Sequence, residues 1–171
     1  MSDWIQTFTG RKFYPLEPRA EDICLEDIAH ALSMKCRYGG HCSRFYSVAE
    51  HSMMVSAFGR SEFCAWGLLH DAAEAYLADI PRPVKPDLKG WNMIEARVMD
   101  AICERFGMYP GEPPEVKEID NRILVDESRA LMPGSDAWNL PFEPLGVRLR
   151  LLSPSAAERL FLRYANAYGL T

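Results

Sequence analysis

The sequence lacks the features of membrane-spanning, exported and nucleic-acid-coating proteins. It has no run of 18 apolar residues, so no segment is expected to cross a bilayer as a helix. The N-terminal stretch MSDWIQTFTG has no basic region followed by an apolar one, so we expect no signal peptide. With a net charge of −5, the chain also lacks the basic excess of a general nucleic-acid coat, although a small anionic substrate in a locally basic pocket is not excluded.

Cysteine is also scarce and shows no C-x-x-C spacing. The five cysteines, at positions 24, 36, 42, 64 and 103, are odd in number. We interpret them as reduced thiols of a cytoplasmic protein. A metal site built from Cys36, His41 and Cys42 is a minor alternative, by analogy with the short ligand spacings of zinc sites.

The sequence contains no internal repeat and no low-complexity tract, and its 171 residues suffice for a single domain over residues 1–171. Apolar residues recur at helical spacing along most of the chain. We therefore predict an all-α fold, a bundle of about six helices with a possible short N-terminal hairpin. The predicted helices cover residues 20–35, 47–58, 61–79, 90–107, 114–131 and 153–169, the hairpin lies within 7–18 and turns at Thr9-Gly10, and residues 147–152 could form a short strand.

Local signals mark several helix ends. Ser47 and Glu50 have the spacing of a capping box, which assigns Glu50 a capping role. Gly107 is a plausible C-cap, and Pro114 suits the first turn of a helix. The three prolines at positions 81, 83 and 86 prevent the 61–79 helix from continuing and predict a stiff loop.

The segment LLHDAAEAYLADIP, residues 68–81, combines an apolar helical pattern with His70, Asp71, Glu74 and Asp79. Ionised groups are costly to bury unless they are paired or bind a metal. In a continuous helix His70 and Glu74 share one face, and neighbouring carboxylates favour a nearby cation. The alternative is a structural pair, in which a buried histidine is hydrogen-bonded to an aspartate.

Two further candidate ligands lie on other predicted helices. His51 lies just inside the 47–58 helix. Asp120 has apolar residues three and four positions away, so it projects from the apolar face of the 114–131 helix, whereas Asp126 has arginines at those positions and is interpreted as a solvated ion-pair residue. The alternative for Asp120 is a buried aspartate that caps the helix or pairs with Lys117.

Together His51, His70, Asp71 and Asp120 offer two nitrogen and two oxygen ligands. This mixture suits one divalent transition metal such as Mn, Fe, Co, Ni or Zn, and Mg remains possible although it prefers oxygen ligands. Four protein ligands leave positions open on an octahedral ion, as a catalytic site requires.

These residues resemble a known family. His51, the His70-Asp71 pair and Asp120 resemble the H…HD…D signature of HD-domain metal-dependent phosphohydrolases. The segments YSVAEHS (46–52), LLHDAAEAYLADIPRPVK (68–85) and VKEID (116–120) are similar to the bacterial 5′-deoxynucleotidases and to phage and prophage enzymes that hydrolyse deoxynucleoside triphosphates. TFTGRKFYPL, DIAHALS and CRYGGH resemble the phage branch in particular. The resemblance runs from about residue 7 to residue 130.

The resemblance implies a role for each candidate residue. His51, His70, Asp71 and Asp120 would bind the metal, Glu74 would orient or deprotonate the attacking water, and Asp79 would act as a second acid or base or contact the sugar. Phosphate would be bound by Arg37, which Tyr38 follows as an aromatic does in the deoxynucleotidases, and also by His41 and Lys85. Arg37 and Lys85 could instead be ordinary surface charges.

The expected function is therefore metal-dependent hydrolysis of deoxynucleotides, either 5′-monophosphates or triphosphates. A catalytically silent HD module that binds a nucleotide and regulates a partner is the alternative. A structural helical domain, with its buried acids paired to Arg and Lys, is a third interpretation. The resemblance further implies a homo-oligomer, and the net charge and the lack of a long apolar run predict no nucleic-acid partner and no membrane association.

Overall fold

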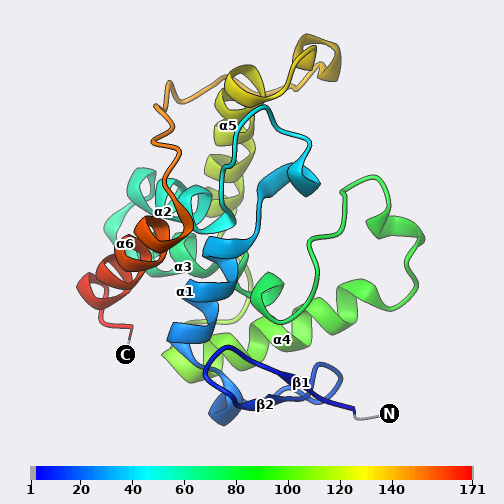
Figure 1. The fold of residues 1–171 in the computed structure, drawn as a ribbon, viewed down its shortest axis with the longest axis vertical. Helices are drawn as coiled ribbons and strands as arrows, with labels where there is room; N and C mark the ends of the chain where they lie inside the picture. The colour runs from blue at the N-terminus through cyan, green and yellow to red at the C-terminus, as the bar shows by residue number, and fades with distance from the viewer. Residues whose placement is uncertain (1–2, 171) are drawn as a thin grey trace.

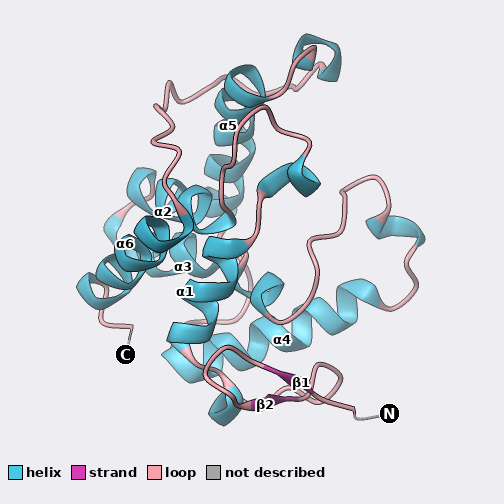
Figure 2. Cartoon of the chain, in the orientation of Figure 1, coloured by secondary structure: helices cyan, strands magenta, loops and turns pink. Residues whose placement is uncertain are grey.

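Helices dominate the structure (Figure 1). The computed structural model describes residues 3–170, apart from the side chain of residue 137, and 57% of the described residues lie in α- or 3₁₀-helices. The α-helices of the described part are α1 (Leu25–Met34), α2 (Val48–Phe58), α3 (Cys64–Leu69), α4 (Trp91–Phe106), α5 (Pro114–Leu131) and α6 (Pro154–Ala167). Two short strands, β1 (Ile5–Gln6) and β2 (Lys12–Phe13), lie near the N-terminus at the lower end of the view in Figure 2. The all-α prediction with a short N-terminal hairpin is confirmed.

The hairpin is fastened to the helices by specific contacts. β1 and β2 are antiparallel, with Ile5 opposite Phe13, and the turn closes where the Gly10 N–H donates to the Thr7 carbonyl. The backbone N–H and the hydroxyl of Thr9 both donate to the carboxylate of Asp27 on α1. Phe13 is fully buried, so the hairpin contributes directly to the core.

Helix α2 is the centre of the packing. It contacts α1, α3, α5 and α6, and in Figure 1 it lies behind α6 and next to α3. The contact with α3 is close because Gly67 has no side chain: a Cβ built there would lie 2.8 Å from the Cα of Ser56. Helix α5 begins at Pro114 and α4 ends before Gly107, which has a φ of 63°, as the sequence predicts.

The predicted continuous helix over residues 61–79 is wrong. Helix α3 ends at Leu69, residues 70–71 form a turn, and a 3₁₀ segment follows over Ala72–Ala75. No Gly or Pro marks this break. The side chain of His70 is hydrogen-bonded to the Gly67 carbonyl three residues earlier, and Asp71 faces Arg37, so one local and one tertiary polar contact replace the regular helix here.

Two acidic residues have roles that the sequence did not predict, and both hold irregular backbone. Glu50 does not close a capping box: although the Ser47 hydroxyl accepts from the Glu50 N–H, the Glu50 carboxylate accepts the N–H groups of residues 150, 151 and 152. This contact explains why residues 147–152 form no strand. Asp126 is likewise no solvated ion-pair residue, because it accepts the N–H groups of Leu145 and Gly146.

Candidate metal centre and its cavity

Four side chains from three parts of the fold converge on one point. Helix α2 contributes His51, the turn after α3 contributes His70 and Asp71, and α5 contributes Asp120. The Nε2 atoms of His51 and His70 are 3.2 Å apart, and Asp120 Oδ1 is 3.2 Å from His51 Nε2. Asp71 Oδ2 lies 3.3 Å from His70 Nε2 and 3.9 Å from His51 Nε2. One ligand atom each from His51, His70 and Asp120 falls within 4.8 Å of the others, so this group could hold a metal ion.

The remaining hydrogen bonds of the two histidines fix which nitrogens face this point. His51 Nδ1 is 2.7 Å from a carboxylate oxygen of Glu127, and His70 Nδ1 is 2.8 Å from the Gly67 carbonyl oxygen. Both partners only accept, so each Nδ1 donates and each Nε2 of a neutral imidazole carries a lone pair. The centre therefore presents lone pairs from two nitrogens and two carboxylates to one another, an arrangement that a shared cation stabilises.

The pKa values of the residues at the centre also indicate that it favours a positive charge. Burial alone would lower the pKa of His70, but Asp71 and Asp120 outweigh burial and raise it to about 9. Burial opposes ionisation of Asp71 and Asp120, yet the neighbouring histidines hold the pKa of both carboxyl groups well below the usual range. Without a metal, a proton on His70 thus supplies the missing positive charge, and a bound cation would displace that proton.

The sequence analysis missed Glu127, which lies behind the centre. Its side chain is fully buried and receives hydrogen bonds from His51 Nδ1, from Arg37 Nη2 at 2.9 Å and from the Tyr38 hydroxyl at 2.7 Å. Burial would raise the pKa of Glu127, but Arg37 and His51 overcome burial and hold it at about 2. Glu127 follows Asp120 by two helical turns and has apolar neighbours at i−4 and i+4, so the periodicity that selected Asp120 also indicated Glu127.

Arg37 lies inside the site rather than on the surface. Its guanidinium pairs with Glu127 on one side, and its Nη1 lies 3.7 Å from Asp71 Oδ2 on the other. The residue next to it, Tyr38, has a φ of 59°, an unfavourable conformation for a residue with a side chain, and it binds Glu127 through its hydroxyl. The two residues link the loop before α2 to α5 at the back of the centre.

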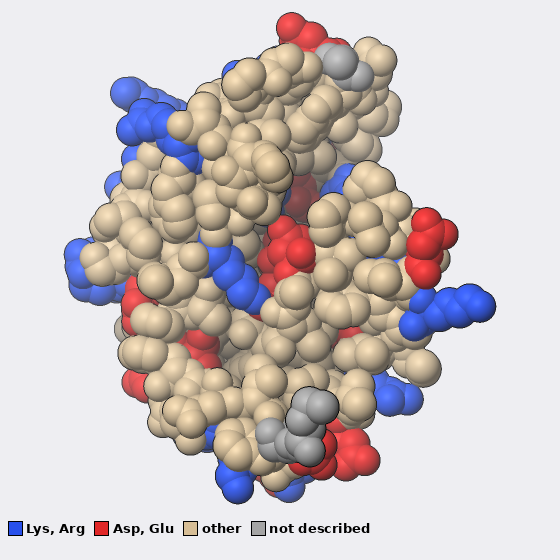
Figure 3. All heavy atoms as spheres, turned by 45° about the vertical axis from the view of Figure 1, so that its right-hand side comes forward, with Lys and Arg blue, Asp and Glu red and all other residues tan. Residues whose placement is uncertain are grey.

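A cavity of about 380 Å³ opens beside the centre. His70, Asp71 and Glu74 line one part of it, and Lys85, Asn92 and Glu95 line another. Figure 3 shows acidic side chains recessed in a hollow near the middle of one face of the molecule, with basic side chains nearby. The volume falls within the range of small-molecule sites, and most of the residues that line the cavity are polar or charged.

Glu74 is the buried acid of this cavity. Its side chain is 8% exposed, and Oε2 has no hydrogen-bond partner among the described residues. Burial, with the negative charges of Asp71 and Asp79, raises the pKa of Glu74 to about 8. A carboxyl group with this pKa exchanges a proton near neutral pH, as a general acid or base does.

The other predicted site residues lie at different depths. Lys85 lines the cavity and pairs with Glu95 at 3.0 Å. Asp79 and His41 are exposed, and neither is among the residues that line the cavity. Lys117 Nζ is 2.9 Å from Asp120 Oδ2, so Asp120 both faces the histidines and pairs with Lys117. The two interpretations of Asp120 are therefore compatible. Its Oδ1 faces His51 as a metal ligand would, and its Oδ2 pairs with Lys117.

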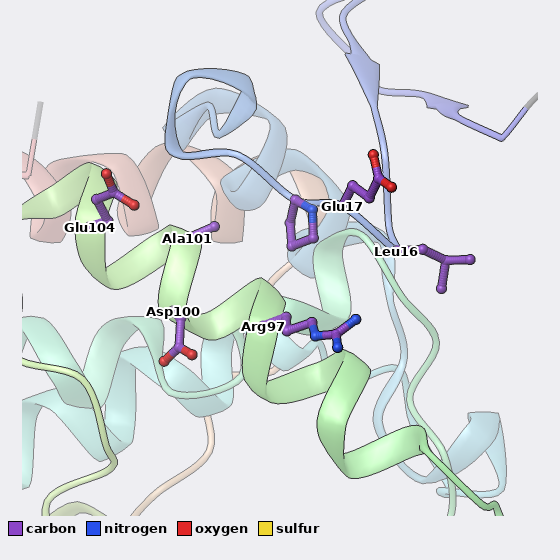
Figure 4. A pocket seen from close by; sticks show the side chains of 7 residues that line it. Leu16, Glu17, Arg97, Asp100, Ala101 and Glu104 are labelled. Carbon is purple, nitrogen blue, oxygen red and sulfur yellow. The ribbon is translucent and has the colours of Figure 1, made fainter.

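A second hollow, of about 340 Å³, lies between α4 and the segment that follows β2 (Figure 4). Arg97, Asp100 and Glu104 extend from α4 in this view, and Leu16 and Glu17 come from the segment after β2. None of the four candidate metal ligands lines it. The alternative site of Cys36, His41 and Cys42 does not appear among the described side-chain groups arranged to hold a metal.

The fold and site define an all-α protein with a buried His-His-Asp group that could hold a metal ion. The chain is 41% identical over 128 residues to a protein of Escherichia coli (strain K12) designated uncharacterized protein YfdR, across 75% of this chain and 72% of YfdR. It therefore belongs to the YfdR family. It is also 36% identical over 124 residues to an uncharacterized protein of Rhodobacter capsulatus, across 67% of this chain and 63% of that protein. No protein-family profile matches the chain.

In the described part, no helix is both long and apolar enough to span a membrane.

Proposed function

We propose that this protein is a divalent-metal-dependent phosphohydrolase that acts on deoxynucleotides. The observation that carries the proposal is the convergence of two histidine Nε2 lone pairs and two carboxylates beside a cavity that also contains an acid with a pKa of about 8. The resemblance of His51, His70-Asp71 and Asp120 to the H…HD…D signature supports the same assignment. The substrate class rests on that resemblance.

In this proposal His51, His70, Asp71 and Asp120 hold the ion. A bound divalent ion lowers the pKa of a water molecule and neutralises phosphate charge. Glu127 and the Gly67 carbonyl keep the two imidazoles in the tautomer that exposes Nε2. Because these partners are buried and preformed, the ligands need little rearrangement to accept a cation.

Glu74 takes the role of general base. Its side chain lines the cavity, where the carboxylate can accept a proton from an attacking water molecule. A positive charge bound beside Asp71 would lower the pKa of Glu74 from about 8, so that the carboxylate form is available near neutral pH. Asp79, which raises the pKa of Glu74 through its charge, is placed to modulate this proton transfer rather than to line the cavity.

Cations around the cavity suit phosphate binding. Lys85 and Lys117 both line it, and each is paired with a carboxylate that a phosphate group could replace. Arg37 directs Nη1 toward Asp71 while its other nitrogens stay on Glu127, so it contributes from the back of the site. His41 remains a candidate phosphate contact only through the resemblance.

The proposal is tested by product analysis with purified protein. A panel of deoxynucleoside mono- and triphosphates is incubated with Mn, Co, Mg or a chelator, and the products are separated by chromatography. Metal-dependent release of phosphate or triphosphate is expected. Turnover of monophosphates alone would assign a 5′-deoxynucleotidase, and no turnover with a metal still bound would favour the silent nucleotide-binding module.

Two variants separate metal binding from proton transfer. Asp71→Ala should abolish hydrolysis and lower the bound metal content. Glu74→Ala should leave the metal bound and slow turnover by roughly 10²–10⁴-fold, the usual contribution of a general base. Asp136→Ala, a change of a surface acid on the segment Ser135–Trp138, is the matched control and should alter neither quantity.

A further inference from the structure

Two cysteine thiols touch at the base of the loop that carries Arg37 and Tyr38. Cys36 Sγ and Cys42 Sγ are 3.5 Å apart, and both residues are free thiols that are half-buried. They begin and end the segment that contains Gly39, Gly40 and His41. Since neither side chain is fully buried, a small thiol reagent can reach the pair.

The backbone at both ends of this loop is held in place. Cys36 forms an isolated antiparallel bridge with Ser47, and the Ser43 N–H donates to the Leu131 carbonyl at 2.8 Å. A disulfide requires the sulfurs to approach to about 2.05 Å. Starting from contact, this approach is on the scale of a side-chain rotation, so the anchored chain ends need not separate.

Between these ends the loop has an unusual backbone conformation, which is energetically unfavourable at Tyr38. Tyr38, Gly39 and Gly40 all have positive φ values, of 59°, 58° and 80°. A left-handed conformation is unfavourable for a residue with a Cβ, so Tyr38 depends on restraints from its surroundings. Its hydroxyl bond to Glu127 is one restraint, and the contact of the two sulfurs at the base is another.

We propose that Cys36 and Cys42 form a reversible disulfide that braces the loop holding Arg37 and Tyr38 against Glu127. The oxidant class is a low-molecular-weight disulfide. This inference goes beyond the proposed phosphohydrolase function and does not depend on it. Disulfides in reducing compartments are in general transient and redox-sensing, so a pair held in contact as thiols is suited to such use.

The exchange proceeds in two balanced steps. The Cys36 thiolate attacks one sulfur of glutathione disulfide, which forms a mixed disulfide and releases one glutathione. The Cys42 sulfur then attacks the Cys36 sulfur, forms the protein disulfide and releases the second glutathione. The two thiol protons end on the two glutathiones, so that the protein is oxidised by two electrons and glutathione disulfide is reduced. Cys42 directs its thiol toward the Arg37 carbonyl oxygen at 3.8 Å, so we assign Cys36 as the first nucleophile.

The test uses the full chain equilibrated in glutathione buffers from fully reduced to fully oxidised. Mass spectrometry should show a loss of about 2 Da and a link between residues 36 and 42. The melting temperature of the oxidised protein should exceed that of the reduced protein by about 5–10 °C, the scale expected for closing so short a loop in a chain of this length. A Cys64→Ser control should retain both responses, and Cys42→Ser should lose both.

Trypsin provides a local readout, because Arg37 lies inside the bridged loop and the exposed Arg44 lies outside it. Oxidation should slow cleavage after Arg37 by about tenfold or more relative to cleavage after Arg44, measured after quenching and reduction. If both cysteines are still alkylated as free thiols in the most oxidising buffer, the disulfide is refuted. If the disulfide forms without a rise in melting temperature and without protection at Arg37, its bracing role is refuted. Hydrolytic activity enters none of these readouts.

Discussion

The buried acid Glu74 should make the metal-free protein less stable as the pH rises. Its pKa is 4.5 in the unfolded chain and about 8 in the folded protein. The folded state therefore holds a proton that the unfolded state has already lost, and stability falls between these two pH values. At about 1.4 kcal/mol for each pH unit, the full cost reaches about 5 kcal/mol at pH 8 and above, an upper limit if the site relaxes.

A Glu74→Gln variant removes this cost while it keeps the size and polarity of the side chain. In chelator, the free energy of unfolding of the variant should exceed that of the parent by a margin that is small near pH 5, widens up to about pH 8 and then stays constant. Denaturant titrations at a series of pH values measure it. Titrations of the other groups near the site are shared by both proteins and largely cancel in the difference.

Two controls sharpen the result. Glu26→Gln makes the same chemical change at an exposed acid on α1 and should not reproduce the pH-dependent margin of Glu74→Gln. Addition of Mn to the parent should narrow its deficit, because a cation beside Asp71 stabilises the charged form of Glu74. Parallel pH profiles for the parent and Glu74→Gln in chelator would refute the assignment of Glu74 as a buried acid with a raised pKa.

Three further predictions concern residues that support the centre. Glu127→Gln removes the negative charge beside His51 Nδ1 and should weaken metal binding by roughly 10–100-fold. Competition with a chromophoric chelator measures the affinity. Unchanged affinity would show that Glu127 does not support the metal centre. Gly67→Ala places a Cβ against the backbone of Ser56 and should lower the free energy of unfolding by about 1–3 kcal/mol. It should also reduce metal affinity, because His70 shifts. Unchanged stability and unchanged metal affinity would contradict the close packing of α3 on α2. Glu50→Ala leaves three backbone N–H groups without their shared acceptor and should cost about 3 kcal/mol or more in denaturant titrations, whereas a loss within about 0.5 kcal/mol would show that solvent replaces the carboxylate.

Periodicity predicted the regular helices well and the polar turns poorly. The boundaries of α5 agree with the predicted helix because Pro114 fixes its start and its apolar face is continuous. The break after Leu69 was not predictable by the same means, since Ala72, Ala73 and Glu74 are good helix formers. There the local hydrogen bond of His70 to the Gly67 carbonyl and the pairing of Asp71 with Arg37 decide the backbone, and the second of these depends on a residue distant in the sequence.

The residues of the candidate centre and its surroundings likewise fall into those that the sequence indicates and those that it does not. Asp120 could be selected because its position on an amphipathic helix is a local property of the sequence. Glu127 satisfies the same criterion, but it orients His51 rather than belonging to the set of metal ligands, so it has no place in a ligand motif. The roles of Glu50 and Asp126 had no sequence signal, because each binds backbone N–H groups of an irregular segment that only the tertiary structure brings near.

The bond between Glu50 and residues 150–152 has a consequence for how the chain is made. Glu50 is 1% exposed in the finished fold, but the N–H groups that donate to its carboxylate lie 100 to 102 residues later. At synthesis rates of about 5–20 residues per second, α2 waits for roughly 5–20 s with a charged group that has no partner. The helical centre of the protein is therefore completed only after residues 150–152 have been synthesised, and α6, which directly follows them, joins the core after the five preceding α-helices of the described part.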